Sequence, residues 1–184
     1  MSLRIRTPEV IERVAVRGLA GTVDVDSKNA TFRIDNEDVK LSNGERAVPA
    51  APGSATQHVT RVFGRPVGGR LDSKPAAAVF LVDEPGGSGI FNYVAVAFSD
   101  CSKTNAVFLG DRIMPRSIVF HGRSIVVTYL DRKLDEPMAA IPKVTKSMTL
   151  GFDSKTCQLA EQNTGPSDAQ CAPRVPDPTG HRPD

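Results

Sequence analysis

The chain has 184 residues with a hydrophobic share of 40%, which suits one domain with a sizeable core together with tails. Its 23 Lys and Arg residues against 21 Asp and Glu leave a net charge of +2 without a basic block, and it has no Trp and only 5% aromatic residues. This composition argues against nucleic-acid binding, which needs a basic stripe and stacking rings, and the lack of an apolar run of about 18 residues argues against a transmembrane segment.

Residues 1–28 are expected to form an N-terminal segment that packs on the domain. Thr7, followed by Pro8 and Glu9, predicts the start of a short helix. A strand is the alternative, since β-branched valines alternate with Ala and Arg over residues 14–17. The opening lacks the hydrophobic core of an export signal, and we expect any such signal to have been removed upstream of this sequence.

The rest of the chain alternates between apolar or β-branched runs and turn residues, which predicts a β-rich domain over residues 29–159. We expect a mainly β fold, an antiparallel meander, half-barrel or sandwich with at most one or two short helices. Strands are predicted at residues 22–25, 30–35, 37–41, 45–49, 57–64, 76–85, 89–100, 106–111, 116–122, 123–131 and 143–153. Residues 160–184 are polar and Pro-rich and predict a largely extended tail.

Turn residues separate several of these strands. Asn43–Gly44 tolerates positive φ at both positions and predicts a hairpin, and His121–Gly122 predicts a tight turn. The stretch PGGSG at residues 85–89 joins the two most apolar strands, which are the best candidates for the core. Residues 65–75 are expected to be irregular.

The three cysteines, Cys101, Cys157 and Cys171, include no CxxC pair, which argues against a zinc or thioredoxin-like site. In an oxidising compartment, a Cys157–Cys171 bridge would close a loop of about 15 residues and contribute about 3 kcal/mol. It would also hold a tail that is poor in apolar residues. Cys101–Cys157 is the competing pair, three reduced cysteines are the third possibility, and the sequence does not choose among them.

Charged residues at the ends of two strand-like runs form the candidate ligand site. They are Asp111, Arg112, Asp131, Arg132 and Glu136. Carboxylates at such places accept backbone N–H bonds in turns, and an Arg fork joins a carboxylate across neighbouring loops. We therefore expect Arg112 or Arg132 to bridge the two loops through Asp131, Asp135 or Glu136, and ligand binding by the same residues is the alternative.

We assign no catalytic residue and no metal ligand. Ser88 in GGSG lacks the GxSxG spacing of a hydrolase elbow and suits a hairpin turn. His58, His121 and His181 come from distant segments and do not show metal-ligand spacing. The carboxylates near Asp131 are candidates for a glycosidase-like acid pair, but the chain offers few aromatic platforms for a sugar.

Several segments resemble an uncharacterised family of bacterial exported or lipid-anchored envelope proteins. The matching segments are TFRIDNEDVKLSNG, PGSATQHVTRVFG, AVFLVDEPGGSGIFNYVAVAF, TNAVFLGDRI and YLDRKLDEPM, and the whole resemblance covers roughly residues 29 to 150. It implies a small β-rich domain located in the periplasm or the outer envelope, or secreted. It brings no activity, cofactor or catalytic residue.

The chain departs from this family at one loop. Members that it resembles carry an Asp- and Asn-rich loop of the GDLNGDG type, suited to a hard cation, where this chain has GGRLDSKPA at residues 68–76. Only Asp72 and Ser73 remain as oxygen donors there, and Arg70 and Lys74 add positive charge. A surface turn without metal is therefore expected.

These features predict a non-catalytic binding or structural module of the bacterial cell envelope, without a cofactor. Its expected partner is an unknown protein or glycan component of the envelope, bound through an exposed sheet face or edge. The alternative is a small envelope hydrolase whose charged site comprises Asp111, Arg112, Asp131 and Glu136.

Overall fold

The computed structural model describes residues 14–17 and 22–162, and this part of the chain is built from strands with no helix. The strands are β1 (Val14–Arg17), β2 (Thr22–Val25), β3 (Thr31–Ile34), β4 (Glu37–Lys40), β5 (Glu45–Pro49), β6 (Gln57–Leu71), β7 (Lys74–Glu84), β8 (Phe91–Phe98), β9 (Thr104–Asp111), β10 (Met114–His121), β11 (Ser124–Asp131), β12 (Val144–Asp153) and β13 (Gln158–Glu161). The mainly β prediction is confirmed, as is the strand at residues 14–17. The helix predicted at Thr7 and nearly all of the predicted tail lie outside the described residues.

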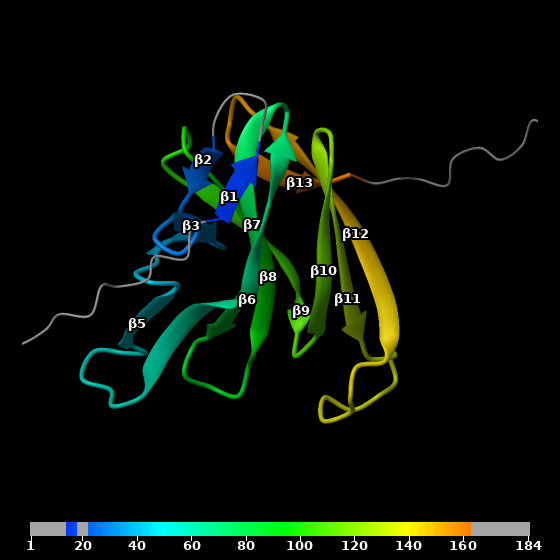
Figure 1. Cartoon of the computed structure of the whole chain (residues 1–184). Coiled ribbons are helices and arrows are strands. Elements are labelled where there is room, and N and C mark those ends of the chain that lie inside the picture. The colour runs from blue at the N-terminus through cyan, green and yellow to red at the C-terminus, as the bar shows by residue number, and fades with distance from the viewer. Residues whose placement is uncertain (1–13, 18–21, 163–184) are drawn as a thin grey trace, which may run out of the picture.

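The strands form two main sheets and one small one (Figure 1). The larger sheet has the order β4-β3-β9-β8-β7-β6-β5 and curls into a nearly closed, barrel-like layer. The second sheet has the order β10-β11-β12-β13 and packs beside β7 to β9. β1 and β2 pair with each other and contact β6 and β7. All pairings are antiparallel except that of β3 with β9.

The Asn43–Gly44 turn forms as predicted but does not continue into a hairpin ladder. Asn43 has φ 55° and Gly44 has φ 87°, and Ser42 and Glu45 make the single bridge between the two arms. Beyond it β4 pairs with β3, while β5 pairs with β6. The turn therefore connects the two edge strands of the curled sheet and brings them towards closure.

The prediction that residues 65–75 are irregular is wrong, because β6 continues to Leu71. Its pairing with β7 shifts register between Phe63 and Val67, and Gly64 supplies a positive φ of 73° within this bulge. Asp72 and Ser73, with φ 48° and 66°, then form the two-residue turn into β7. The GGRLDSKPA stretch thus contains a tight hairpin turn.

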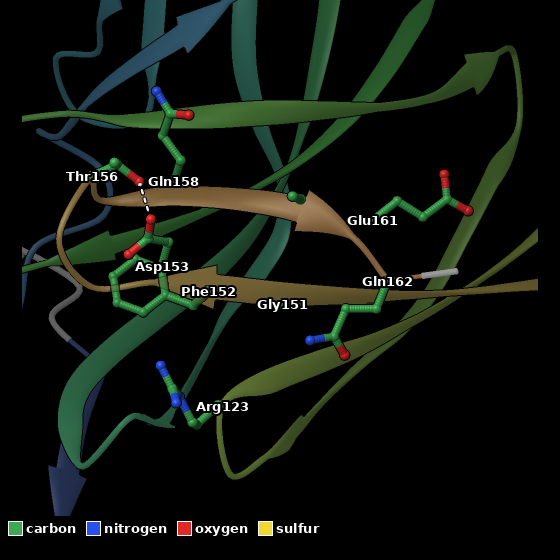
Figure 2. A pocket seen from close by; sticks show the side chains of 9 residues that line it. Arg123, Gly151, Phe152, Asp153, Thr156, Gln158, Glu161 and Gln162 are labelled. Atoms are coloured by element: carbon green, nitrogen blue, oxygen red, sulfur yellow. Dashed lines mark hydrogen bonds between the residues drawn. The ribbon is translucent and has the colours of Figure 1, made fainter. Parts of the chain in front are cut away.

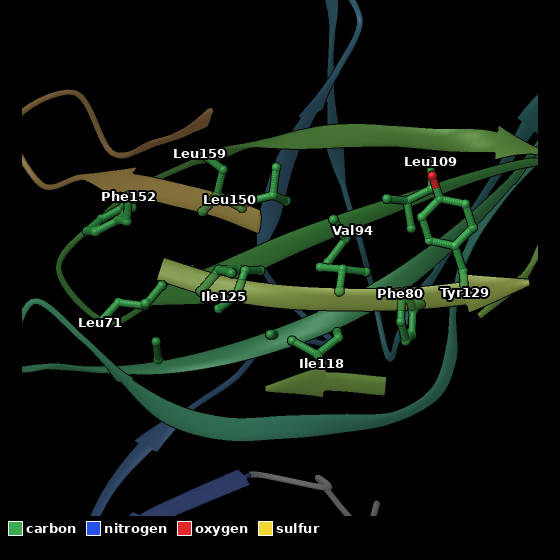
Figure 3. Close-up of a cluster of buried hydrophobic side chains, with 14 of the residues drawn as sticks. Leu71, Phe80, Val94, Leu109, Ile118, Ile125, Tyr129, Leu150, Phe152 and Leu159 are labelled. Atoms are coloured by element: carbon green, nitrogen blue, oxygen red, sulfur yellow. The ribbon is translucent and has the colours of Figure 1, made fainter. Parts of the chain in front are cut away.

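β7 and β8 are the centre of the fold because both of their faces are buried. One face contributes Phe80, Val94 and neighbours to a cluster between the two sheets, where Leu150 and Ile125 meet them from the second sheet (Figure 3). The other face contributes Leu81 and other residues to a second cluster inside the curled sheet, and Phe32 of β3 and Val39 of β4 pack against them. Near-continuous apolar sequence in both strands follows from this double burial.

The two sheets are also linked covalently and by a side-chain amide. Cys101, in the loop after β8, forms a disulfide with Cys157, in the turn between β12 and β13. Of the two pairings that the sequence left open, Cys101–Cys157 forms, and the Cys157–Cys171 pairing is wrong because the sulfur of Cys157 is already bonded to that of Cys101. The amide of Asn105 donates to the Leu159 carbonyl at 2.8 Å and accepts from the Leu159 N–H at 2.6 Å.

Candidate functional site

The structure brings the predicted charged residues together, and Arg132 holds them. Its guanidinium is buried and donates to the carbonyl oxygens of Asp111 at 2.8 Å and Arg112 at 3.2 Å. The expected bridge between the two loops therefore exists, but the expected carboxylate partner is wrong. Two backbone carbonyls of the β9–β10 turn take its place, because Arg112 adopts φ 50° there and turns them towards the second loop.

The other members of this charged cluster have structural partners as well. Asp111 accepts the Ile90 N–H at 2.9 Å, and Arg112 donates to the Ser88 carbonyl. Glu136 accepts the N–H of Lys133 at 3.0 Å within its own turn. These contacts tie the turns after β7, β9 and β11 to one another.

Asp131 lies in the same cluster and pairs with Lys146 at 2.6 Å, while its other oxygen accepts the N–H of Arg132 at 2.7 Å. Partial burial raises the pKa of the Asp131 carboxyl, but the hydrogen bonds from Lys146 and the Arg132 N–H outweigh it and bring this pKa below its ordinary value. The hydrogen bond to Asp131 in turn raises the pKa of Lys146. Asp131 therefore acts as an ionised partner for β12.

A groove on the β12–β13 hairpin is the first alternative site (Figure 2). Asp153 organises the hairpin turn by accepting the Lys155 N–H at 2.9 Å and the Thr156 hydroxyl at 3.0 Å, which lowers the pKa of its carboxyl. Figure 2 shows the side chains of Gln158 and Gln162 pointing in different directions. The polar groups of this groove thus do not converge on a common ligand position.

A second pocket lies on the concave face of the curled sheet and combines acidic and aromatic side chains. We call it the concave-face pocket; its volume is about 480 Å³, and it is lined by Asp35, His58, Asp83, Pro85, Phe91, Tyr93 and Phe108. Pockets of this kind and size commonly bind small ligands at the mouths of curled sheets.

Strand alternation places these residues on one face. In β7, Leu81 points into the cluster inside the curled sheet, so Asp83, two residues later, points to the same side. Asp83 pairs in register with Thr60 on β6 and with Phe91 on β8. β3 and β4 cover the apolar part of this face, and the pocket begins at Asp35, in the turn directly after β3.

Asp83 is the polar centre of the pocket. It is only 6% exposed, and its Oδ1 accepts the Thr60 hydroxyl at 2.6 Å and contacts His58 Nε2 at 2.8 Å. Thr60 itself is fully buried. No Lys or Arg lines the pocket, so these two hydrogen bonds hold a buried carboxylate whose Oδ2 receives none from the described residues.

Tyr93 connects the pocket floor to its rim. Its hydroxyl donates to the Asp35 carboxylate at 3.2 Å, and Asp35 sits in the turn after β3 with φ 49°, a conformation that Asp tolerates. Burial raises the pKa of the Tyr93 hydroxyl, and the Asp35 charge raises it further. Tyr93 therefore stays protonated and remains a hydrogen-bond donor.

Aromatic rings form one wall of the pocket. Phe108 lies 5.3 Å from Tyr93 and 6.2 Å from Phe91 between ring centroids, with interplanar angles of 60° and 63°. Its side chain is nevertheless 48% exposed. The rings therefore form an inclined corner that opens to solvent.

Sequence reasoning missed this pocket because its members are far apart along the chain. His58 was considered only with the other histidines, and the part of the chain that the structure describes contains no cluster of His, Cys, Asp and Glu able to hold a metal. One signal was available: Asp83 is a carboxylate near the end of an apolar strand, at an inward position of the strand alternation. His181 and Cys171 lie outside the described residues.

Comparisons with family models, with curated proteins and with solved structures give no match to this chain. Over residues 14–17 and 22–162 there is no helix long and apolar enough to cross a membrane.

Proposed function

We propose that this chain is a non-catalytic binding module of the bacterial cell envelope and that the concave-face pocket is its ligand site. The observation that carries the proposal is a buried carboxylate, Asp83, fixed by two hydrogen bonds behind a partly exposed aromatic wall. Strands hold all but one of the polar groups, so the pocket is formed before a ligand arrives.

The envelope location is supported by the disulfide and by the resemblance to exported proteins. Stable disulfides are typical of oxidising compartments such as the periplasm or the extracellular space. Cys101–Cys157 joins two sheets rather than two neighbouring residues of an exposed loop, which is typical of a structural bridge.

A binding role fits the chemistry of the pocket better than catalysis. Among the residues that line it, no Ser, Thr or Cys is available as a nucleophile beside His58. The Tyr93 hydroxyl donates to Asp35 and stays protonated. The charged cluster of Arg132 is used in contacts between turns, so no observation favours a hydrolase there.

The test for binding is a fragment screen read by backbone amide chemical shifts of the ¹⁵N-labelled protein. The screen contains small cationic, uncharged and anionic organic compounds, and we expect at least one to shift amides around Asp83 and Tyr93. Phe108→Ala should weaken that effect. Phe63→Ala is a matched control, because Phe63 is 47% exposed and lies outside the pocket. A screen in which no compound shifts pocket amides would refute the binding role.

The location is tested separately in cells of the native organism. Fractionation and non-reducing mass spectrometry should place the protein outside the cytoplasm with Cys101 and Cys157 linked. A cytoplasmic protein with both cysteines reduced would contradict the envelope assignment.

A further inference from the structure

We infer that the concave-face pocket binds a small organic cation, with an alkylammonium group directed at Asp83. This inference rests on the proposed function, because it names the ligand class of the same pocket. Charge, aromatic geometry and shape each support it.

The charge of the lining is negative. Asp35 and Asp83 contribute two carboxylates, and His58 is the sole basic side chain among the lining residues. The sum is −2 with neutral His58 and −1 with protonated His58. Arg61, on the neighbouring strand, pairs with Glu84 instead. An anionic ligand would therefore meet repulsion, and a cation would meet attraction.

Asp83 has no Lys or Arg partner, and the side chain paired with it is His58, which carries a charge only when protonated. Taking a carboxylate out of water is costly unless hydrogen bonds or an opposite charge compensate it. Two hydrogen bonds to Oδ1 provide part of this compensation, and the described residues supply no Lys or Arg. A ligand ammonium reaching the pocket floor would supply the missing charge.

The aromatic wall suits a cation bearing alkyl groups. The faces of Phe and Tyr rings carry negative electrostatic potential, and corners formed by several rings bind alkylated ammonium groups. Phe108 meets Tyr93 at 60° and Phe91 at 63°, which produces such a corner rather than a flat stack. The alkyl groups would gain apolar contact there while the charge faces the two carboxylates.

Size and depth indicate a small molecule. A volume of about 480 Å³ lies within the range of small-molecule sites, and the pocket runs from Asp83, 6% exposed, to Phe108, 48% exposed. The ligand would therefore place its ammonium group inward and its other end at the rim. A pocket of this size accommodates a small organic cation.

The experiment compares, by amide chemical shifts, three probes that share a head group of three methyls on one central atom. They are choline, its uncharged isostere with a tert-butyl group in place of trimethylammonium, and pivalate. We expect choline to shift pocket amides and to bind about tenfold more tightly than the isostere, and pivalate to bind more weakly still. Equal affinity for choline and its isostere, or tighter binding of pivalate, would overturn the cation assignment while leaving a binding pocket. No pocket shift with any probe of the wider screen would overturn both.

Two variants assign the charge to named carboxylates. Asp83→Asn preserves the acceptor for Thr60 and should weaken choline binding about tenfold. Asp35→Asn, at the exposed rim, should weaken it less and keeps the test valid if Asp83→Asn fails to fold. Asp153→Asn, on the distant hairpin, is the matched control and should leave affinity unchanged. Cosedimentation with phosphatidylcholine vesicles, lost in Asp35→Asn, would overturn the free-ligand part by assigning the site to a lipid headgroup.

Discussion

Removing the Cys101–Cys157 disulfide should lower stability strongly, because the bridge closes a long loop between two sheets. The cysteines are 56 residues apart in sequence. Cross-linking a loop of that length removes unfolded-state entropy equivalent to about 4 kcal/mol near room temperature. For a domain of this size that loss corresponds to a fall in melting temperature of about 10 °C.

The assay is urea and thermal unfolding of a Cys101→Ala/Cys157→Ala variant, followed by far-ultraviolet circular dichroism. Cys171→Ala is the matched control, since Cys101–Cys157 does not use that residue. We expect the double variant to lose most of the 4 kcal/mol and the control to match the wild type. The bridge also joins β8 to the second sheet, so the variant should retain its strands but unfold at lower urea.

Two results would refute this reasoning. A double variant within about 1 kcal/mol of the wild type would mean that packing alone holds the sheets together and that the loop-closure estimate does not apply. A loss in Cys171→Ala instead would mean that Cys157 pairs with Cys171. Non-reducing peptide mapping distinguishes these outcomes from a general folding defect.

Three further predictions concern single residues. Arg132→Ala should cost about 3 kcal/mol in chemical unfolding, because it leaves two turn carbonyls without their buried charged donor, and Arg132→Lys should recover only part of this. The pKa of Tyr93 is raised in the folded state, so its contribution to the free energy of unfolding is full below about pH 10 and falls as the pH rises further. Tyr93→Phe should therefore reduce the loss of stability that unfolding titrations measure at alkaline pH. An unchanged pH profile would contradict this. Gly69→Ala should cost about 1–3 kcal/mol because its Cβ would overlap the Phe120 ring, whereas Gly87→Ala, where a Cβ meets nothing, should be neutral in the same measurement.

Local sequence patterns were sufficient to place most strands and several turns. We could place β2 to β5 and the central strands β7 and β8 from two patterns between turn residues: alternation of apolar and polar residues, and short apolar runs. The Asn43–Gly44 turn followed from the positive φ that these two residues accept. The mistaken irregular region at residues 65–75 shows the limit of this reasoning: glycines weaken a strand pattern, yet pairing with β7 holds the strand in place beyond its bulge.

Long-range pairings could not be predicted because they depend on how distant segments meet. Nothing near Thr31 indicates that β3 will lie parallel to β9, more than 70 residues later. The same holds for the cysteines, where the sequence left two pairings open and the one that closes the longer loop formed. The charged cluster was partly predictable: Arg132 was expected to join two loops, but its carbonyl partners depend on the positive φ of Arg112.

The concave-face pocket arises from the same alternation that builds the core. Leu81 and Asp83 point to the same side of β7, and the difference between core and pocket is whether β3 and β4 cover them. Where that cover ends, inward residues change from aliphatic to acidic and aromatic. A folding requirement alone would favour another aliphatic residue at position 83, since burying a carboxylate lowers stability even when it is hydrogen-bonded. Asp83 at that position is therefore better explained by a ligand than by the fold. Because Asp83→Leu alone would leave the buried Thr60 hydroxyl without its acceptor, the test is the double variant Asp83→Leu/Thr60→Val, which should be about as stable as the wild type while abolishing choline binding.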